Sequence, residues 1–350
     1  MGANDGRVPG PATPLFQSGN DEDKLVIVLL AEGFQNIEFS EFFNHCHSLQ
    51  HRLVNEPWFY DAEFNSAINL YYLFVASNES GIDDPTECGG TGAEPATFFD
   101  ATYCPVGVVD GRAVRKPRRV VGIDIFAVYD VLNEHVPTWD IGLVLCNSRE
   151  LGGATSPFER PIITLTVHQG WQDSAIHELG HAAFDLLDEY DFFDSCERDG
   201  PSAERAPSGP DLMAANVTNV NSREELKWRH LVADDVPIPT MENPDCSTCD
   251  RRPNVLDTDL TWLGRLLRSL YDAVRRFIDR FRRIFGGGGR RTRPRFEVDD
   301  DDLKVGLFEG ANYYRCGYYR PVYRCKMRDQ RQPFCPVCLE QINKVLEGYR

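Results

Sequence analysis

Short apolar runs, separated by stretches of helical spacing, predict an α/β layer in the first half of the chain. A continuous apolar run is typical of a strand that is buried on both faces. Four such runs lie at 24–30, 69–75, 140–146 and 162–167, and helical spacing falls between them at 37–53 and near 126–132. Strands that alternate with helices indicate a sheet that is mostly parallel.

The segment directly after this layer carries a metal-ligand pattern. Residues 174–191 are S-A-I-H-E-L-G-H-A-A-F-D-L-L-D-E-Y-D. On a helix His177 and His181 share one face, so both imidazoles can bind one ion, and Glu178 beside them can take a proton from a metal-bound water. Two histidines at this spacing also occur by chance on buried helices. The glutamate between them, and Gly180, which lets another segment approach closely, favour a catalytic zinc site.

A catalytic zinc needs a third protein ligand, and the sequence offers two neighbouring candidates. On an unbroken helix Asp188 would lie about 16 Å from His177. The helix must therefore end near 184–186 and the chain must turn back, which brings Asp188 or Glu189 to the metal. Compact zincins usually place a glycine at that turn, and this chain has none there. We prefer Asp188, with Glu189 as the alternative.

The stretch from His177 to Tyr190 resembles the H-E-x-G-H…L-x-D-E-Y signature of the IgA-peptidase family of zinc metallopeptidases, relatives of the metzincins. Other parts of the chain resemble further blocks of that family, at 25–34, 77–81, 216–218, 227–228, 305–311, 317–321, 325–328 and 334–338. The resemblance covers about residues 15–345. It implies a metzincin-like zincin catalytic domain with a mixed, mostly parallel sheet and an active-site helix that carries the HExxH motif.

The resemblance also implies a methionine turn beneath the zinc and an edge segment that binds an extended substrate. Met327 matches the methionine position, and Met213 is the competitor; otherwise Met327 is ordinary core packing. Residues 147–154 match the edge segment, against which a substrate would add as a strand. An ordinary turn is the other interpretation of that segment.

Composition changes suggest how the chain is divided. Residues 1–22 are rich in Pro, Gly and acidic residues and read as a flexible lead-in. We expect one metallopeptidase domain over 23–350, with an upper sub-domain at 23–190, a lower one at 191–350 and an insert at about 257–302. Within the insert, 263–285 has amphipathic helical spacing, and 263–295 hold eleven arginines against two aspartates. This helix either packs on its own acidic domain or docks on an anionic membrane or acidic partner.

The eleven cysteines require an explanation. Cys88 and Cys104 flank a glycine-rich loop that a disulfide would close. Two C-x-x-C pairs, at 246–249 and 335–338, have a spacing that both structural zinc sites and redox pairs use. More than eighty residues separate the pairs, which favours disulfides or free thiols over a second zinc.

Charge and hydropathy narrow the class of protein. A net charge of −17 argues against nucleic-acid binding, and no apolar run is long enough to cross a membrane. The N-terminus shows no signal peptide, which favours the cytoplasm, whereas the cysteine count favours an oxidising compartment and the family is often secreted. The compartment therefore stays open, and we expect a monomer.

The sequence thus predicts a zinc-dependent endopeptidase that cleaves a protein or peptide substrate. His177, His181 and Asp188 would hold Zn²⁺, and Glu178 would act as general base. The alternative is a weakly active or inactive zinc fold that binds partners through the Arg-rich helix. The intact Glu178 counts against that alternative, because a binding protein has no need of it. Nothing in the residues selects an immunoglobulin as substrate.

Overall fold

The computed structural model describes residues 6–7, 12–53, 56, 65–109, 111–156, 158–192, 204–249 and 304–349. The basic helix that the sequence predicts at 263–285, and the rest of the insert at 257–302, lie outside the described residues.

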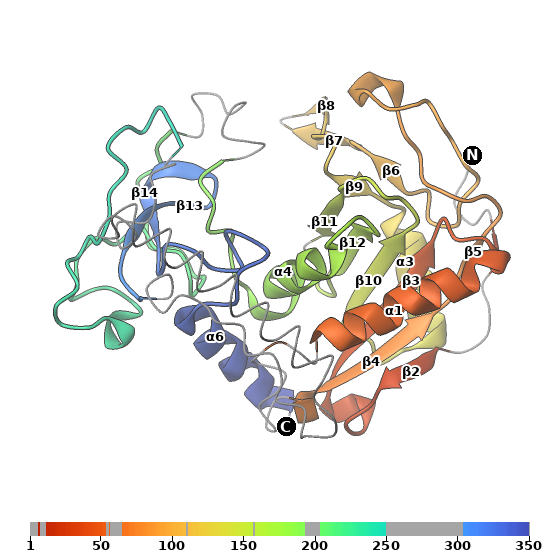
Figure 1. The fold of residues 1–350 in the computed structure, drawn as a ribbon, viewed down its shortest axis with the longest axis horizontal. Helices are drawn as coiled ribbons and strands as arrows, with labels where there is room; N and C mark the ends of the chain where they lie inside the picture. Colours follow the sequence, from red (N-terminus) through yellow and green to blue (C-terminus); the bar gives the residue numbers. More distant parts are fainter. Residues whose placement is uncertain are drawn as a thin grey trace, which may run out of the picture.

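A six-stranded mixed sheet forms the larger part of the fold (Figure 1). Its strands, in spatial order, are β11 (Gly153–Ser156), β12 (Ile162–Thr166), β10 (Ile141–Cys146), β3 (Leu25–Glu32), β4 (Ile68–Leu73) and β2 (Thr13–Phe16). The four inner strands are parallel to one another, while β11 and β2 run antiparallel at the two edges. The predicted α/β class with a mostly parallel sheet is confirmed.

Strand β3 is buried along its whole length because both faces of the sheet are covered. Successive side chains of a strand point to opposite faces. Leu25, Ile27 and Leu29 therefore enter one core, whereas Val26 and Val28 enter the other. This is why the sequence shows an unbroken apolar run here instead of an alternating one.

Helices cover the two faces. Helix α1 (Phe39–Leu53) and helix α4 (Trp171–Phe184) belong to the first core, and helix α3 (Ile125–His135) belongs to the second. In Figure 1, α1 lies in front of the sheet and α3 behind it. Helix α6 (Pro336–Leu346) near the C-terminus also joins the first core and packs on α4.

A second, smaller part lies beyond α4, on the left in Figure 1. Its regular structure is the antiparallel pair β13 (Phe308–Ala311) and β14 (Tyr314–Arg320). Asn312 and Tyr313 form the tight turn with φ of 49° and 68°, the left-handed region that two-residue hairpin turns use. Segments from 204–249 bridge to this pair through Arg205, Thr218 and Met241.

Small strands complete the description. They are β1 (Gly6–Arg7), β5 (Ala76–Ser77), β6 (Thr102–Tyr103), β7 (Val106–Val109), β8 (Arg112–Arg115) and β9 (Val121–Gly122). Strand β2 lies within the lead-in that we expected to be flexible over 1–22, so the ordered sheet begins earlier than composition suggested. The sequence does not reveal this strand because Pro argues against a central strand, and β2 is an edge strand with an irregular register after Pro14.

The cysteines divide into two groups. Cys88 and Cys104 form a disulfide, as predicted for the glycine-rich loop. Cys246 pairs with Cys316 on β14, and Cys249 is also disulfide-bonded. The 246–249 pair therefore ties its loop to other parts of the chain and is not a metal site. Cys335 and Cys338 are free thiols.

Within the described ranges, no helix is both long enough and apolar enough to span a membrane.

Candidate metal centre

Helix α4 presents the two histidines and ends just after them. It begins after Gly170, whose φ of 83° lies in the left-handed region. It ends at Phe184 because Asp185 also turns left-handed, with φ 53° and ψ 32°, and Leu186 N–H donates back to Gly180 O at 3.0 Å. An aspartate thus makes the turn for which a glycine is the usual residue, since short polar side chains tolerate this conformation.

The turn brings Asp188 back to the histidine face. Nε2 of His177 and Nε2 of His181 each lie 3.2 Å from Oδ1 of Asp188. That oxygen is buried and has no hydrogen-bond partner of good geometry among the described residues. The three side chains form a group whose ligand atoms all lie within 4.8 Å of one another. Two imidazoles and a carboxylate aimed at one point are a donor set that fits a divalent metal ion.

Backbone carbonyls orient both rings. Nδ1 of His177 donates to Lys326 O at 3.0 Å, and Nδ1 of His181 donates to Leu186 O at 2.6 Å. With the proton on Nδ1, the unprotonated Nε2 is left to bind a metal. The Tyr313 hydroxyl donates to Oδ2 of Asp188, which leaves Oδ1 for the metal. The chain therefore presents three oriented ligands.

The protonation of His181 and Asp188 depends on their burial and on how close these two side chains lie to each other. Burial alone would lower the pKa of His181, but the adjacent Asp188 carboxylate outweighs it and raises that pKa to about 9. Burial alone would raise the pKa of Asp188, but the two histidines hold it well below its ordinary value. In the absence of metal, the site therefore holds a proton on His181 where a cation would bind.

Glu178 is half-buried on the same helix and faces the sheet edge. The hydroxyl of Thr155, on edge strand β11, donates to Oε2 of Glu178. This contact fixes one carboxylate oxygen and leaves the other to accept a proton. The position of Glu178 beside both histidines is the one that the motif predicts.

Met327 packs against helix α4 at Gly180. Its side chain is fully buried, and its sulfur would lie 2.6 Å from a Cβ built on Gly180. Gly180 therefore permits the close approach that we expected of it, and the approaching segment is 325–334. Met213, the competitor, is fully exposed, so the alternative that it packs beneath the metal is wrong.

Glu189, the alternative third ligand, turns away from the histidines. Its buried side chain lies instead with Cys325, Cys335 and Cys338. The structure thus brings His177, His181 and Asp188 together and separates Glu189 from them.

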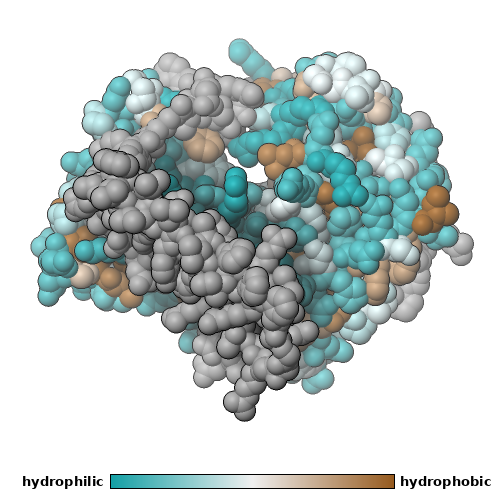
Figure 2. Space-filling model, in the orientation of Figure 1, coloured by the Kyte–Doolittle hydropathy of each residue, from teal (hydrophilic) through white to brown (hydrophobic). Residues whose placement is uncertain are grey.

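A cleft opens beside the centre. A cavity of about 870 Å³ is lined by residues in and just before α4, among them His168, Ser174 and His177, and also by Tyr190, Phe192 and Arg328. In the space-filling view the surface is open between the sheet side and the β13–β14 side of the molecule (Figure 2). A cleft of this size accommodates several residues of an extended peptide.

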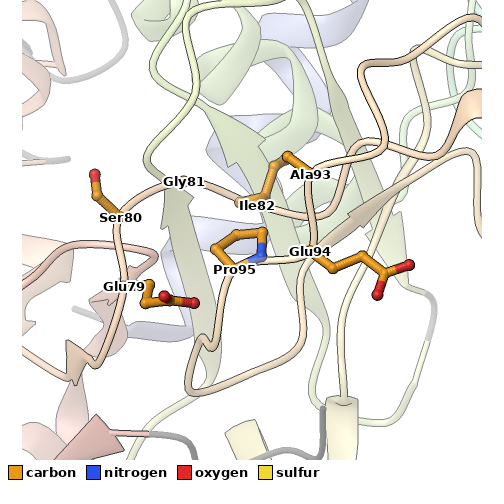
Figure 3. A pocket seen from close by; sticks show the side chains of 7 residues that line it. All are labelled: Glu79, Ser80, Gly81, Ile82, Ala93, Glu94 and Pro95. Carbon is orange, nitrogen blue, oxygen red and sulfur yellow. The ribbon is translucent and has the colours of Figure 1, made fainter.

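A smaller hollow of about 370 Å³ lies elsewhere, under the loop that follows β5. Its lining is Glu79, Ser80, Gly81, Ile82, Ala93, Glu94 and Pro95 (Figure 3). None of these seven is a histidine or cysteine, and Ser80 and Glu94 point away from the Pro95 ring. The lining of this hollow therefore holds no histidine or cysteine, whereas the cleft beside α4 includes His177.

The fold and the centre together define a class of protein. A mixed sheet, a helix with two histidines and an adjacent glutamate, and a returning carboxylate form the architecture of a metallopeptidase. The chain belongs to the IgA peptidase M64 family, whose sequence model matches residues 13–346. It is accordingly a metallopeptidase, a hydrolase that acts on peptide bonds. A comparison with curated proteins finds no match.

Two contacts at the centre escaped the sequence analysis. Thr155 lies in a strand that the sequence shows only as a polar turn, and Tyr313 lies in a hairpin more than a hundred residues from Asp188. The signal for Tyr313 was the A-N-Y-Y stretch, in which Asn312 is a turn residue between two apolar runs. Nothing in the local pattern around Thr155 pointed to Glu178.

Proposed function

We propose that the chain is a zinc-dependent endopeptidase whose metal is held by His177, His181 and Asp188. The observation that carries this proposal is the convergence of both Nε2 atoms on the Asp188 oxygen. A nitrogen–nitrogen–oxygen set with an open side suits zinc. When bound, zinc lowers the pKa of a water molecule and polarises the scissile carbonyl.

Glu178 acts as the general base and then as the acid. Its free carboxylate oxygen accepts a proton from the attacking water and passes it to the leaving amine. The Thr155 hydroxyl holds the other oxygen, so the carboxylate keeps one orientation through both transfers. Tyr313 plays the corresponding role for Asp188, since its hydroxyl fixes the oxygen that faces away from the histidines.

Edge strand β11 is the proposed docking site for the substrate backbone. Gly153 N–H points away from β12 and donates to Arg119 O at 2.9 Å. Because alternate residues of an edge strand point the same way, the N–H and C=O of Thr155 also point outward. A peptide that adds beside Thr155 lies next to Glu178. The predicted docking segment at 147–154 thus moves toward the centre, to 153–156.

The two parts of the fold are the proposed sub-domains. Five of the six strands and α4 belong to the upper one at 23–190, the edge strand β2 precedes it, and the β13–β14 pair belongs to the lower one at 191–350. The second candidate function, binding through the predicted 263–285 helix, stays an alternative, because that helix lies outside the described residues.

The test is Glu178→Gln. The amide keeps the size of the side chain but cannot take a proton, so peptide cleavage is expected to fall about 10²- to 10⁴-fold while zinc content stays unchanged. The measurement pairs kcat on a fluorogenic peptide library with zinc per chain by elemental analysis. Glu347→Gln, at an exposed position after α6, is the matched control and keeps full activity. If Glu178→Gln cleaves as fast as the control does, the proposed mechanism is wrong.

A further inference from the structure

A second group of metal-ligand side chains lies behind the candidate active site. It consists of Cys325, Cys335, Cys338 and Glu189, and all four side chains are fully buried. One ligand atom from each lies within 4.8 Å of the others. The three thiols are free of disulfides. The proposed peptidase mechanism uses none of these groups.

The spacing of the sulfurs is that of ligands around one ion. Sγ of Cys325 and Sγ of Cys338 are 3.6 Å apart. A disulfide bond is only about 2.0 Å long. Two thiolates that each lie about 2.3 Å from a tetrahedral zinc are separated by about 3.8 Å. The arrangement therefore matches a shared metal better than a covalent bond, and any disulfide within the trio would leave one buried thiol over.

The backbone favours thiolates at this place. Cys335 caps α6, and Pro336 occupies the first helical position. Cys338 N–H donates to Sγ of Cys335 at 3.5 Å, and Cys335 N–H donates to Sγ of Cys325 at 3.4 Å. Peptide N–H groups and the positive end of a helix both stabilise a negatively charged sulfur.

Glu189 supplies an independent observation. Its Oε1 accepts a hydrogen bond from Nδ2 of Asn216 at 3.0 Å. Its Oε2 is buried and has no hydrogen-bond partner among the residues that the structure describes. A buried carboxylate oxygen without a partner is costly, and the three sulfurs beside this carboxylate offer it only one weak S–H contact, which goes to Oε1. A cation between them removes that cost.

We propose that Cys325, Cys335, Cys338 and Glu189 bind a structural zinc ion, distinct from the metal of the active site. Three soft thiolates select zinc over calcium or magnesium. Four protein ligands leave no open position, and full burial keeps water out, so this ion does no chemistry.

The inferred ion stabilises the active site, because its ligands are close in the sequence to active-site residues. Glu189 directly follows Asp188, and Cys325 stands two residues before Met327. Between them, Lys326 O accepts the hydrogen bond from His177 Nδ1. Glu189 N–H also donates to Met327 O at 2.8 Å. One ion thus holds together the segments that carry Asp188, Met327 and the Lys326 carbonyl that orients His177.

The inference goes beyond the proposed function, and its test does not depend on catalysis. The protein for the test is a His177→Ala/His181→Ala double variant, produced with zinc in the medium and dialysed free of loose metal. We expect about one zinc per chain to remain. X-ray absorption at the zinc edge is expected to show sulfur neighbours at about 2.3 Å. Wild type is expected to hold about two zinc ions per chain.

Variants of the cluster sharpen the result. On the same double-variant background, Cys338→Ser is expected to lose most of the remaining zinc, and Glu189→Gln is expected to weaken its retention during dialysis. Cys46→Ala is the matched control, because Cys46 is also a buried free thiol but lies in α1. It should retain the zinc.

Two results overturn the proposal. One is a folded double variant without zinc, or with zinc that has only nitrogen and oxygen neighbours. The other is a disulfide within the trio, seen by mass after alkylation of denatured, unreduced protein. The double variant has an intact cluster, so failure of Cys338→Ser to fold leaves the test decisive. Failure of the proposed peptidase function would appear separately, in Glu178→Gln.

Discussion

At the residue scale, the sequence alone does not determine whether Asp188 or Glu189 is the third ligand. The H-E-L-G-H motif predicts two histidines and a glutamate on one helix face, and helix geometry predicts a turn that returns an acidic residue. We preferred Asp188 to the adjacent Glu189, but the motif leaves the choice open, because the direction of each side chain depends on the turn that precedes it. Asp185 makes this turn without glycine, and it sends Asp188 to the histidines and Glu189 to the cysteines.

The residue scale also carries a prediction about pH. The pKa of His181 is raised to about 9, so at neutral pH the metal-free site holds a proton that zinc must displace. The affinity of this site for zinc is therefore expected to rise about tenfold per pH unit up to about pH 9 and to level off above it. The measurement is the free zinc, set with a metal buffer, that gives half-maximal peptide cleavage at each pH. A requirement that does not change between pH 7 and pH 9 contradicts the assignment.

At the element scale, apolar patterns predicted most of the buried strands and helices, and they missed strands that carry polar or charged residues. β3, β10, β12, α1 and α3 coincide with predicted segments to within a few residues at each end. β11, β13 and β14 were missed because tertiary contacts hold them. The β13–β14 pair, for instance, buries the charged side chains of Glu309, Arg315 and Arg320, which a hydrophobic pattern does not reveal.

The packing of α4 on the segment below it gives a prediction at this scale. Gly180→Ala places a methyl group against the fully buried Met327 sulfur. A Cβ in ideal geometry at position 180 would lie only 2.6 Å from that sulfur, which is too close. Overpacking costs about 1–3 kcal/mol, and alanine stabilises a helix by about 1 kcal/mol relative to glycine, so we expect a net loss of up to about 2 kcal/mol in the free energy of unfolding. Urea unfolding measures the difference.

The matched control for Gly180→Ala is Gly209→Ala, because nothing lies within 4 Å of a Cβ at that position. Its stability is expected to stay within about 0.5 kcal/mol of wild type. A Gly180→Ala protein as stable as the Gly209→Ala protein would show that Met327 does not pack tightly beneath the helix.

At the scale of the whole molecule, the candidate active site depends on both parts of the fold. α4 and β11 supply the histidines, Glu178 and Thr155 from the sheet side. Tyr313 and the Lys326 carbonyl come from the C-terminal side, more than a hundred residues away. The motif locates the centre, but the contacts that orient its ligands arise only when the two parts pack together. A local pattern such as the A-N-Y-Y stretch can predict a turn at Asn312, but it cannot predict that Tyr313 contacts Asp188.

The family match over residues 13–346 agrees with this dependence, because it spans both parts of the fold. The centre is therefore expected to form only in a chain that holds the sheet, α4 and the β13–β14 pair together.

The most direct test of the central claim is anomalous diffraction at the zinc edge, from crystals of protein purified without chelator. We predict a peak about 2.0–2.1 Å from Nε2 of both His177 and His181 and about 2.0–2.2 Å from Oδ1 of Asp188. The same crystals, soaked in chelator, should lose that peak and the peptidase activity together. A well-ordered protein with active peptidase and no metal between these three side chains would contradict the claim.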